Sequence, residues 1–152
     1  MIDHNFDTRD AELHTAIELF FFAYRAFTAQ PDAILAERGL ARLHHRILYF
    51  VARRPGQRVS DLLATLGVSK QALHGPLKQL LESGLVLMQE DANDRRARCL
   101  SLSDEGLTLE ARLSQTQREI LAGVFARQGE GAEFAWRQVM TELAGRSGGG
   151  QA

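Results

Sequence analysis

The feature that most constrains how this chain can fold is the spacing of glycine and serine between residues 59 and 102. Two runs with leucines at helical spacing are followed by Gly67 and Gly84, and glycine is the preferred residue in the left-handed conformation that ends a helix. Only Val68 separates Gly67 from Ser69, which is a good N-terminal cap for the next helix. The spacing therefore predicts two short helices joined by a tight turn, a helix-turn-helix.

A hairpin pattern follows the second helix directly. Residues 85–90 are strand-like, residues 91–94 are rich in turn-forming Asp and Asn, and residues 96–102 return as a second strand. A helix-turn-helix followed by such a hairpin is a winged helix, and we call the hairpin the wing. A narrow hairpin tip can enter the minor groove of DNA, where the negative potential favours arginine, while the preceding helix lies in the major groove. Three arginines lie in or beside the loop of the wing: Arg95, Arg96 and Arg98.

The charge of the chain is unevenly distributed. The net charge is only −1 at pH 7, yet residues 38–98 hold eleven Lys and Arg against five Asp and Glu, a balance of +6. The rest of the chain holds seven basic residues against fourteen acidic ones. A basic centre between acidic ends favours one module that meets a polyanion, and the alternative is chance clustering on a solvated surface.

Apolar residues on the N-terminal side indicate a long helix that packs on other helices. Between residues 13 and 27 they recur at intervals of three and four, and further phenylalanines widen the apolar surface beyond one stripe. We expect such a helix to contact several helices, some of them in a second subunit. It should end before Pro31, because proline disfavours helical geometry at the preceding residue. The apolar positions are Leu13, Ile17, Phe20, Phe21, Phe22, Tyr24 and Phe27.

Further helices are predicted on both sides of the winged helix. Residues 40–53 form one before it, Ser60 is a candidate cap for the first helix of the helix-turn-helix, and Ser103 can cap a long helix after the wing. Gly129 and Gly131 should end that helix, and a last helix follows. The inner positions of these two C-terminal helices are Leu109, Leu113, Ile120 and Val124, then Phe134, Trp136, Val139, Met140 and Leu143.

Composition predicts one integrated domain, mostly α-helical with a small β-hairpin wing. At 152 residues and 45% hydrophobic content the chain can form a real core. We expect an N-terminal dimerisation helix at residues 1–36, a winged helix-turn-helix lobe at 37–103, C-terminal dimerisation helices at 104–145 and a disordered tail at 146–152. The single Cys99 excludes an intramolecular disulfide and fits a reducing compartment. No signal peptide or membrane-spanning stretch is recognised, so we expect a cytoplasmic protein without membrane association.

The order of these elements, and two segments of sequence, resemble the MarR family of bacterial transcriptional regulators. "LGVSKQALHGPLKQLLESGLV" looks like the recognition helix of that family, and "DANDRRARCLSLSDEG" looks like its Asp-Arg-Arg wing leading into Leu-Thr-x-x-Gly, with Ser101-Leu102-Ser103 in place of the usual Arg/Thr-Leu-Thr. The resemblance covers roughly residues 10–145 and is most specific over 59–106.

The resemblance implies a regulator, most simply a repressor, that binds a pseudo-palindromic operator in double-stranded DNA as a homodimer. A small anionic or phenolic effector would release it, and no cofactor is expected. The effector would bind between the dimerising helices and the DNA-binding lobe, near Phe20, Tyr24, His44 and Arg46. The dimer would form through the first and last two helices, at Leu13, Ile17, Phe20, Phe21, Tyr24, Leu113, Ile120, Val124, Trp136, Val139, Met140 and Leu143.

The residues expected to contact DNA lie on the outer face of the recognition helix and in the wing. Lys70 and Lys78 are suited to phosphates, and Gln71 and His74 to base edges, since an amide side chain offers the donor and acceptor that adenine requires. Arg96 matches the minor-groove arginine of the family, and Asp94 would orient it through an ion pair. The full set is Ser69, Lys70, Gln71, His74, Lys78, Arg95, Arg96 and Arg98.

The dipeptide Gly75-Pro76 departs from an ordinary recognition helix. An interior proline removes a backbone hydrogen bond and costs about 3 kcal/mol or more. Because Gly75 has no Cβ to clash with the proline ring, we expect a tolerated kink rather than a broken helix. The kink would alter how His74 and Lys78 are presented to the groove.

Three other functions compete with this interpretation. An enzyme is disfavoured, because the adjacent His44 and His45 point about 100° apart on a helix and no phosphate loop or nucleophile elbow is found. A redox sensor would use Cys99, whose pKa the neighbouring Arg98 could lower, although a small strand residue explains Cys99 better. A winged helix used as a protein-interaction module would need neither the basic centre nor the arginines of the wing.

Overall fold

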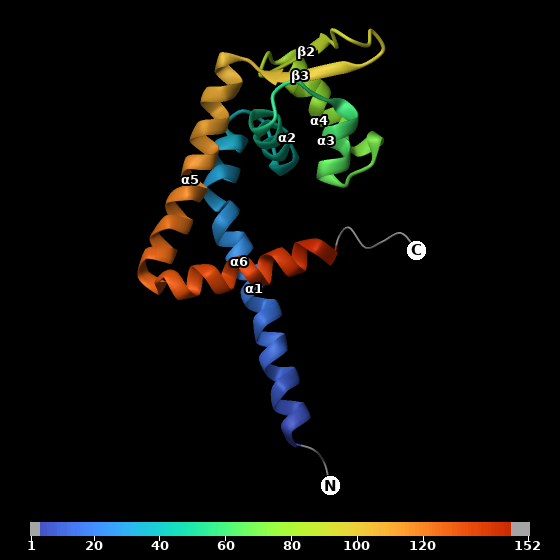
Figure 1. Ribbon diagram of the computed structural model, residues 1–152. Coiled ribbons are helices and arrows are strands. Elements are labelled where there is room, and N and C mark those ends of the chain that lie inside the picture. Colours follow the sequence, from blue (N-terminus) through green and yellow to red (C-terminus); the bar gives the residue numbers. More distant parts are fainter. Residues whose placement is uncertain (1–3, 147–152) are drawn as a thin grey trace. The chain divides into compact units, whose positions relative to one another are not determined.

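The computed structural model describes residues 4–146, with side chains from residue 8 onward. Within this range the chain forms six helices and a three-stranded antiparallel sheet, which confirms a mostly α-helical fold with a small hairpin (Figure 1). The chain divides into two compact units, one up to Thr116 and the other from Gln117 on. The elements are α1 (His4–Ala36), α2 (Arg42–Arg53), β1 (Gln57–Arg58), α3 (Val59–Leu66), α4 (Lys70–Glu82), β2 (Val86–Glu90), β3 (Arg98–Leu102), α5 (Asp104–Gln128) and α6 (Glu130–Gly145).

The core of the first unit lies where α2, α3 and α4 pack beside the sheet (Figure 1). Each helix contributes residues at helical spacing, so that one face is apolar and the opposite face is free for polar side chains. The ends of α1 and α5 that belong to this unit add further leucines. The buried hydrophobic residues are Leu35, Leu40, Ile47, Leu48, Val51, Leu62, Leu73, Leu77, Leu80, Leu85, Val86, Leu100, Leu109 and Leu113.

The sheet has the strand order β1-β3-β2, and β3 lies in the middle. Strands β2 and β3 pair from Val86↔Leu102 to Glu90↔Arg98, so β3 begins at Arg98 and the loop of the wing runs over residues 91–97. The sequence predicted a shorter loop and missed β1, whose two residues are too few to form a pattern. The buried side-chain amide of Gln57 donates to the Phe50 and Arg54 carbonyls and so holds β1 to the end of α2.

The turn of the helix-turn-helix is formed as the sequence predicts. Gly67 adopts φ +63°, in the left-handed region, and the Ser69 hydroxyl accepts the Ala72 N–H at 3.1 Å. The prediction for Ser60 was wrong, because α3 begins at Val59, two residues before the start that a Ser60 cap requires. The Asp61 carboxylate accepts the Arg58 N–H at 3.1 Å and replaces the serine cap.

Two prolines lie inside helices. α1 continues through Pro31 to Ala36, so the predicted end before Pro31 was wrong. Pro31 and Leu35 are fully buried, and this burial offsets the cost of an interior proline. α4 likewise continues through Pro76, so the helix is not broken there, and the expected kink stays a prediction.

The start of α5 packs against the base of the wing. The Ser103 hydroxyl accepts the Gly106 N–H at 3.1 Å and donates to the Gly84 carbonyl at 2.6 Å, which confirms Ser103 as the cap. A Cβ on Gly106 would lie 2.0 Å from the Leu85 carbonyl oxygen, so this close approach requires glycine. At the other end, Gly129 with φ +94° separates α5 from α6, whereas Gly131 lies inside α6. Residues 147–152 of the predicted tail lie outside the described residues.

Candidate nucleic-acid interface

The helix α4 has one buried and one exposed face. Leu73, Leu77 and Leu80 are at most 7% exposed and fix the helix on the core. The predicted DNA-contacting residues Lys70, Gln71, His74 and Lys78 are all exposed on the other side. Ser69 is exposed too, but its hydroxyl caps the helix. The amphipathic pattern therefore brings the predicted polar set onto the surface of one helix.

A groove of about 520 Å³ runs along this helix between α3, α4 and β2. Its floor is apolar, and its rim carries two lysines and a histidine from the exposed face of α4. The groove therefore combines a concave shape with the positive charge of two lysines. The lining residues are Val59, Ser60, Leu63, Lys70, Leu73, His74, Leu77, Lys78, Leu81 and Met88.

The loop of the wing is held by hydrogen bonds of its own. The Asp91 carboxylate accepts the Asn93 N–H at 2.9 Å, and the Asp94 carboxylate accepts the Arg96 N–H at 3.0 Å. The Ala97 N–H donates to the Asp94 carbonyl at 3.0 Å. Within residues 4–146, the Asp94 carboxylate forms no ion pair with the Arg96 guanidinium, in contrast to our expectation. Asp94 orients the backbone at Arg96 instead.

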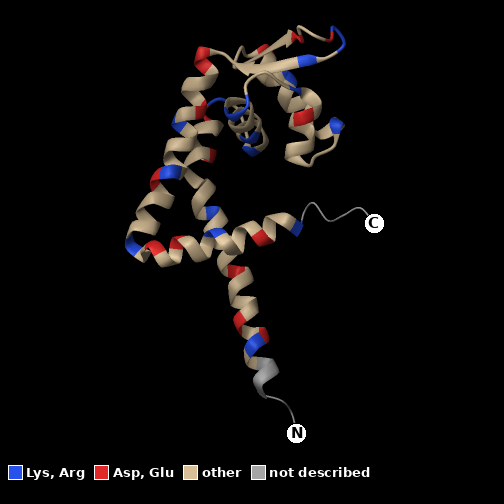
Figure 2. Ribbon diagram, in the orientation of Figure 1, with Lys and Arg blue, Asp and Glu red and all other residues tan. Residues whose placement is uncertain are grey.

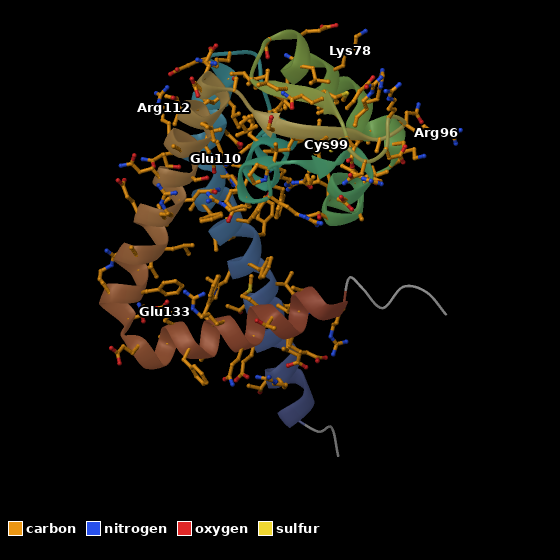
Figure 3. All side chains as sticks on the ribbon, turned by 45° about the horizontal axis from the view of Figure 1, so that its top comes forward. Lys78, Arg96, Cys99, Glu110, Arg112 and Glu133 are labelled. Atoms are coloured by element: carbon orange, nitrogen blue, oxygen red, sulfur yellow. The ribbon has the colours of Figure 1, made fainter. Side chains whose placement is uncertain are left out.

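The basic residues of the lobe differ in whether a carboxylate neutralises them. Arg98 pairs with Glu90 at 3.1 Å, and Lys78 lies 3.8 Å from Glu82. In the part of the chain that the structure describes, Lys70, Arg95 and Arg96 have no carboxylate within 4.0 Å. Figure 2 shows basic residues at the loop of the wing, and Figure 3 shows the Arg96 side chain extending away from the ribbon there. Positive charge is therefore available on α4 and at the loop.

Sequence reasoning missed an ion pair between Arg58 and Asp91. The Arg58 Nε and Nη2 atoms lie 3.1 and 2.9 Å from Asp91 Oδ2. Asp91 was interpreted only as a turn residue, and Arg58 only as part of the positive charge. Thirty-three positions separate the two, so no local pattern could have paired them.

Cys99 lies on β3 (Figure 3), where it faces Arg58 in the β1–β3 register. Desolvation is the main cause that raises the pKa of the Cys99 thiol. The Asp91 carboxylate raises this pKa further, while Arg58 lowers it. Arg98, which was expected to lower this pKa, pairs with Glu90. The thiol is therefore held protonated, and the surroundings disfavour the reactive thiolate that a redox sensor needs.

The candidate effector residues lie on α1 and α2. The Arg46 guanidinium donates to the Tyr24 hydroxyl at 2.7 Å, and Phe20 is 55% exposed. His44 is buried, and both of its ring nitrogens are engaged: one accepts the Ala41 N–H at 2.9 Å and the other lies 2.8 Å from the Gln79 amide oxygen. His44 therefore links α2 to α4.

The neighbouring His45 differs from His44 in its hydrogen bonding. Its Nε2 atom is buried and has no hydrogen-bond partner among the described residues. Burial lowers the pKa of His45, although Glu110 and Asp32 act in the opposite direction. Glu110 is buried on α5, where the Ser114 hydroxyl donates to it and Arg53 lies 3.2 Å away. Among residues 4–146, no three His, Cys, Asp or Glu side chains are grouped to hold a metal ion.

The predicted dimerisation residues are mostly exposed large hydrophobics. In α1 these are Leu13, Ile17, Phe20, Phe21 and Tyr24, and Leu19 and Phe22 on the same helix are also exposed. In the second unit Val124, Trp136, Val139 and Leu143 are exposed, while Ile120 and Met140 are half-buried. Leu113 is fully buried in the core of its own chain, so it is not available to a partner. None of the described helices is long and apolar enough to cross a membrane.

Comparison with known proteins identifies the lobe. A family model described as "MarR family" matches residues 38–97, from the start of the α2 region to the loop of the wing. The HTH-type transcriptional regulator PetP of Rhodobacter capsulatus is 41% identical over 134 residues, which cover 88% of this chain and 81% of PetP. The chain belongs to the MarR family. It is a MarR-family transcriptional regulator with a winged helix-turn-helix, and this family is not one of enzymes.

Solved structures agree with the MarR fold. NadR in complex with 4-hydroxyphenylacetate is 24% identical, with a TM-score of 0.69, over 82% of this chain and 89% of NadR. A mutant of S. aureus MepR bound to an oligodeoxyribonucleotide is 16% identical, with a TM-score of 0.58, over 86% of this chain and 96% of MepR. In the MarR-family lobe of this chain, the matched residues 38–97 include all of α4 and the entire loop of the wing.

Proposed function

We propose that this MarR-family regulator binds double-stranded DNA, with α4 in the major groove and the loop of the wing in the minor groove. The observation that carries the proposal is that Lys70, Arg95 and Arg96 are exposed without a neutralising carboxylate among the described residues. Binding to phosphates gains most from charges that no internal partner has already neutralised. MepR, which shares the fold, has been solved with an oligodeoxyribonucleotide.

Each contact then has a role. Lys70 and Lys78 bind phosphates and position the helix, while Gln71 and His74 read base edges. Arg96 enters the minor groove, and Asp94 fixes the backbone from which it extends. Arg95 adds charge at the same tip. Ser69 and Arg98 contribute less, since the first caps α4 and the second pairs with Glu90.

The same proposal includes a homodimer that represses transcription in the cytoplasm. Residues 8–26 of α1 are all exposed in the single chain. They include six large hydrophobic side chains and Tyr24, which would contact water if no partner covered them. Exposed apolar patches of this size are rare on a monomer and mark an interface. A two-fold dimer presents two recognition helices, and its operator is then an inverted repeat.

The proposal also includes release by a small effector that binds near Tyr24 and Arg46. The guanidinium of Arg46 already binds the phenolic hydroxyl of Tyr24, and it suits a phenolic or anionic ligand equally well. The solved NadR complex contains 4-hydroxyphenylacetate, which carries both groups. His44 and Phe20 lie on the same two helices, and His44 would respond through its hydrogen bond to Gln79 on α4.

Selection of bound duplexes from a random library at near-physiological salt tests the function. We expect an inverted repeat with half-sites about 10 bp apart, and log affinity that falls with log salt by about 0.9 per phosphate contact. Recovery of unrelated duplexes would indicate non-specific binding. Recovery of none would favour the protein-interaction module. The selected operator then allows 4-hydroxyphenylacetate to be tested for release of the complex.

A single substitution in the wing sharpens this test. Arg96→Ala should weaken operator binding by about 1–3 kcal/mol, because it removes a minor-groove contact. Arg112→Gln is the matched control, since it removes one exposed arginine of α5 that lies outside the lobe and 3.8 Å from Glu37. Equal losses in titrations of the two variants would mean that only net charge matters.

A further inference from the structure

We propose that Asp91 is a positioning residue for DNA binding, because its ion pair with Arg58 fixes the wing against the start of α3. This inference rests on the proposed DNA binding. Neither Arg58 nor Asp91 is among the predicted DNA-contacting residues of the recognition helix and the wing, so this role is additional to theirs. Neither side chain needs to touch DNA for the role to hold.

The Arg58 side of the contact is part of the helix-turn-helix. Arg58 ends β1 and directly precedes Val59, the first residue of α3. Its backbone N–H donates to Asp61 at 3.1 Å, which fixes the first turn of α3. Its guanidinium directs two N–H groups, from Nε and Nη2, at a single oxygen of Asp91. A planar guanidinium that donates two hydrogen bonds holds its partner in one orientation.

The Asp91 side of the contact is part of the wing. Asp91 directly follows β2, and its other oxygen, Oδ1, accepts the Asn93 N–H at 2.9 Å. The same carboxylate lies near the Cys99 thiol of β3 and raises the pKa of that thiol. The carboxylate is only 17% exposed, although Arg58 remains 45% exposed. The Asp91 side chain thus connects the loop of the wing to the residue that directly precedes α3. The pKa of Asp91 is lowered by the Asn93 N–H and by Arg58, so Asp91 keeps its charge.

The wing needs such a connection because little else ties it to the helices at this end. Strand β1 pairs with β3 over only two residues, Gln57↔Leu100 and Arg58↔Cys99. Beyond Glu90 and Arg98 the ladder ends, and residues 91–97 extend past it with hydrogen bonds that are local to the loop. In the described part of the chain, the Arg58–Asp91 contact is the one ion pair between this loop and a helix start. It therefore sets where Arg96 lies relative to α4.

The chain offers a matched control in the neighbouring pair Glu90–Arg98. These two residues face each other in the β2–β3 register and are 59% and 50% exposed. They connect the two strands of the wing to each other and not to α3. Glu90→Gln removes the same negative charge one residue before Asp91, so it separates positioning from electrostatics.

The sign of the effect distinguishes the two explanations. Asp91→Asn removes an acidic group from a DNA-binding surface, so electrostatics alone predicts tighter binding. Positioning predicts weaker operator binding, by about fivefold, as expected for a partly exposed ion pair. Arg58→Gln should lose about as much, and the double variant Arg58→Gln/Asp91→Asn no more than either single one. Arg58→Lys, which keeps the charge, should recover part of the loss.

The experiment combines operator titrations with amide hydrogen exchange of the free full-length protein. Asp91→Asn should reduce protection of the Asn93 and Ala97 amides and weaken operator binding, while Glu90→Gln should not weaken it. Operator binding by Asp91→Asn that equals or exceeds that of the unaltered protein would overturn the positioning role. If the unaltered protein selects no operator, the proposed function fails first, and the exchange data still report whether the ion pair holds the wing. Melting temperatures of all variants identify any that fail to fold.

Discussion

The winged lobe and the first half of α1 use their apolar residues in opposite ways. In the lobe, leucines such as Leu48, Leu62 and Leu80 are fully buried, and the polar residues of α4 face outward. In α1, residues 8–26 are all exposed, although Ile17 and Phe20 are as apolar as any core residue. The lobe therefore contains its own core, whereas this part of α1 must find its apolar partners elsewhere. The proposed dimer provides them.

Leu80→Ala tests whether the lobe depends on its own core. Leu80 is fully buried, so its truncation should lower the free energy of unfolding by about 2–5 kcal/mol. Chemical denaturation followed by circular dichroism measures the loss. The loss should be the same at all protein concentrations at which the association state is unchanged. A loss below about 1 kcal/mol would mean that the lobe is not closely packed.

Ile17→Ser tests the opposite behaviour in α1. Ile17 is 65% exposed in the single chain, so the substitution should leave the lobe intact while removing apolar area from the dimer. Burial of such a side chain contributes about 1.5–3 kcal/mol, and a two-fold dimer contains it twice. Sedimentation equilibrium should show a raised dimer dissociation constant. Glu12→Gln on the exposed surface of the same helix serves as the control. Unchanged self-association would remove Ile17 from the proposed interface.

Gly106→Ala examines the junction between α5 and the wing. The new Cβ would meet the Leu85 carbonyl oxygen at 2.0 Å, and backbone atoms must move to relieve the clash. Overpacking of this kind costs about 1–3 kcal/mol, which a thermal melt would record. Gly131→Ala is the control, because its Cβ meets nothing within 4 Å and alanine favours a helix. A neutral Gly106→Ala would show that the junction is looser than the structure indicates.

Acidification should have the smallest effect, and it acts through His45 on α2 of the lobe. Burial lowers the pKa of His45 below its ordinary value of 6.5, so the folded state binds its proton less readily than the unfolded state. The stability that depends on neutral His45 is therefore complete above pH 6.5 and falls as the pH drops from 6.5 through the folded-state pKa. Denaturation midpoints across this range measure it. His45→Gln should flatten that part of the profile, and an unchanged slope would assign it to other groups.

Local chemistry explains why the helix-turn-helix could be predicted. Gly67 ends α3, Ser69 caps α4, and Ser103 caps α5, each through contacts within three or four residues. The polar outer face of α4 follows from the spacing of its leucines. Candidate DNA contacts on that face, such as Gln71 and His74, are therefore exposed where the pattern placed them, and their roles stay predictions.

Predictions that depended on distant parts of the chain fared less well. Pro31 continues a helix because burial offsets its cost, and Leu113 joins the core while Val124, on the same apolar stripe, is exposed. The partner of Asp91 is thirty-three residues away. Hydrophobic spacing identifies an apolar face but not which chain covers it.

The order of the helices, the turn, the wing and the family follow from the sequence alone, since caps, glycines and side-chain spacing act over a few residues. Which charges remain available and which are neutralised depends on the fold. Arg58 and Arg98 pair with carboxylates, whereas Arg96 extends free of one among the described residues. The physical reason is that an ion pair depends on distance in space, and the fold brings together side chains that the sequence keeps apart.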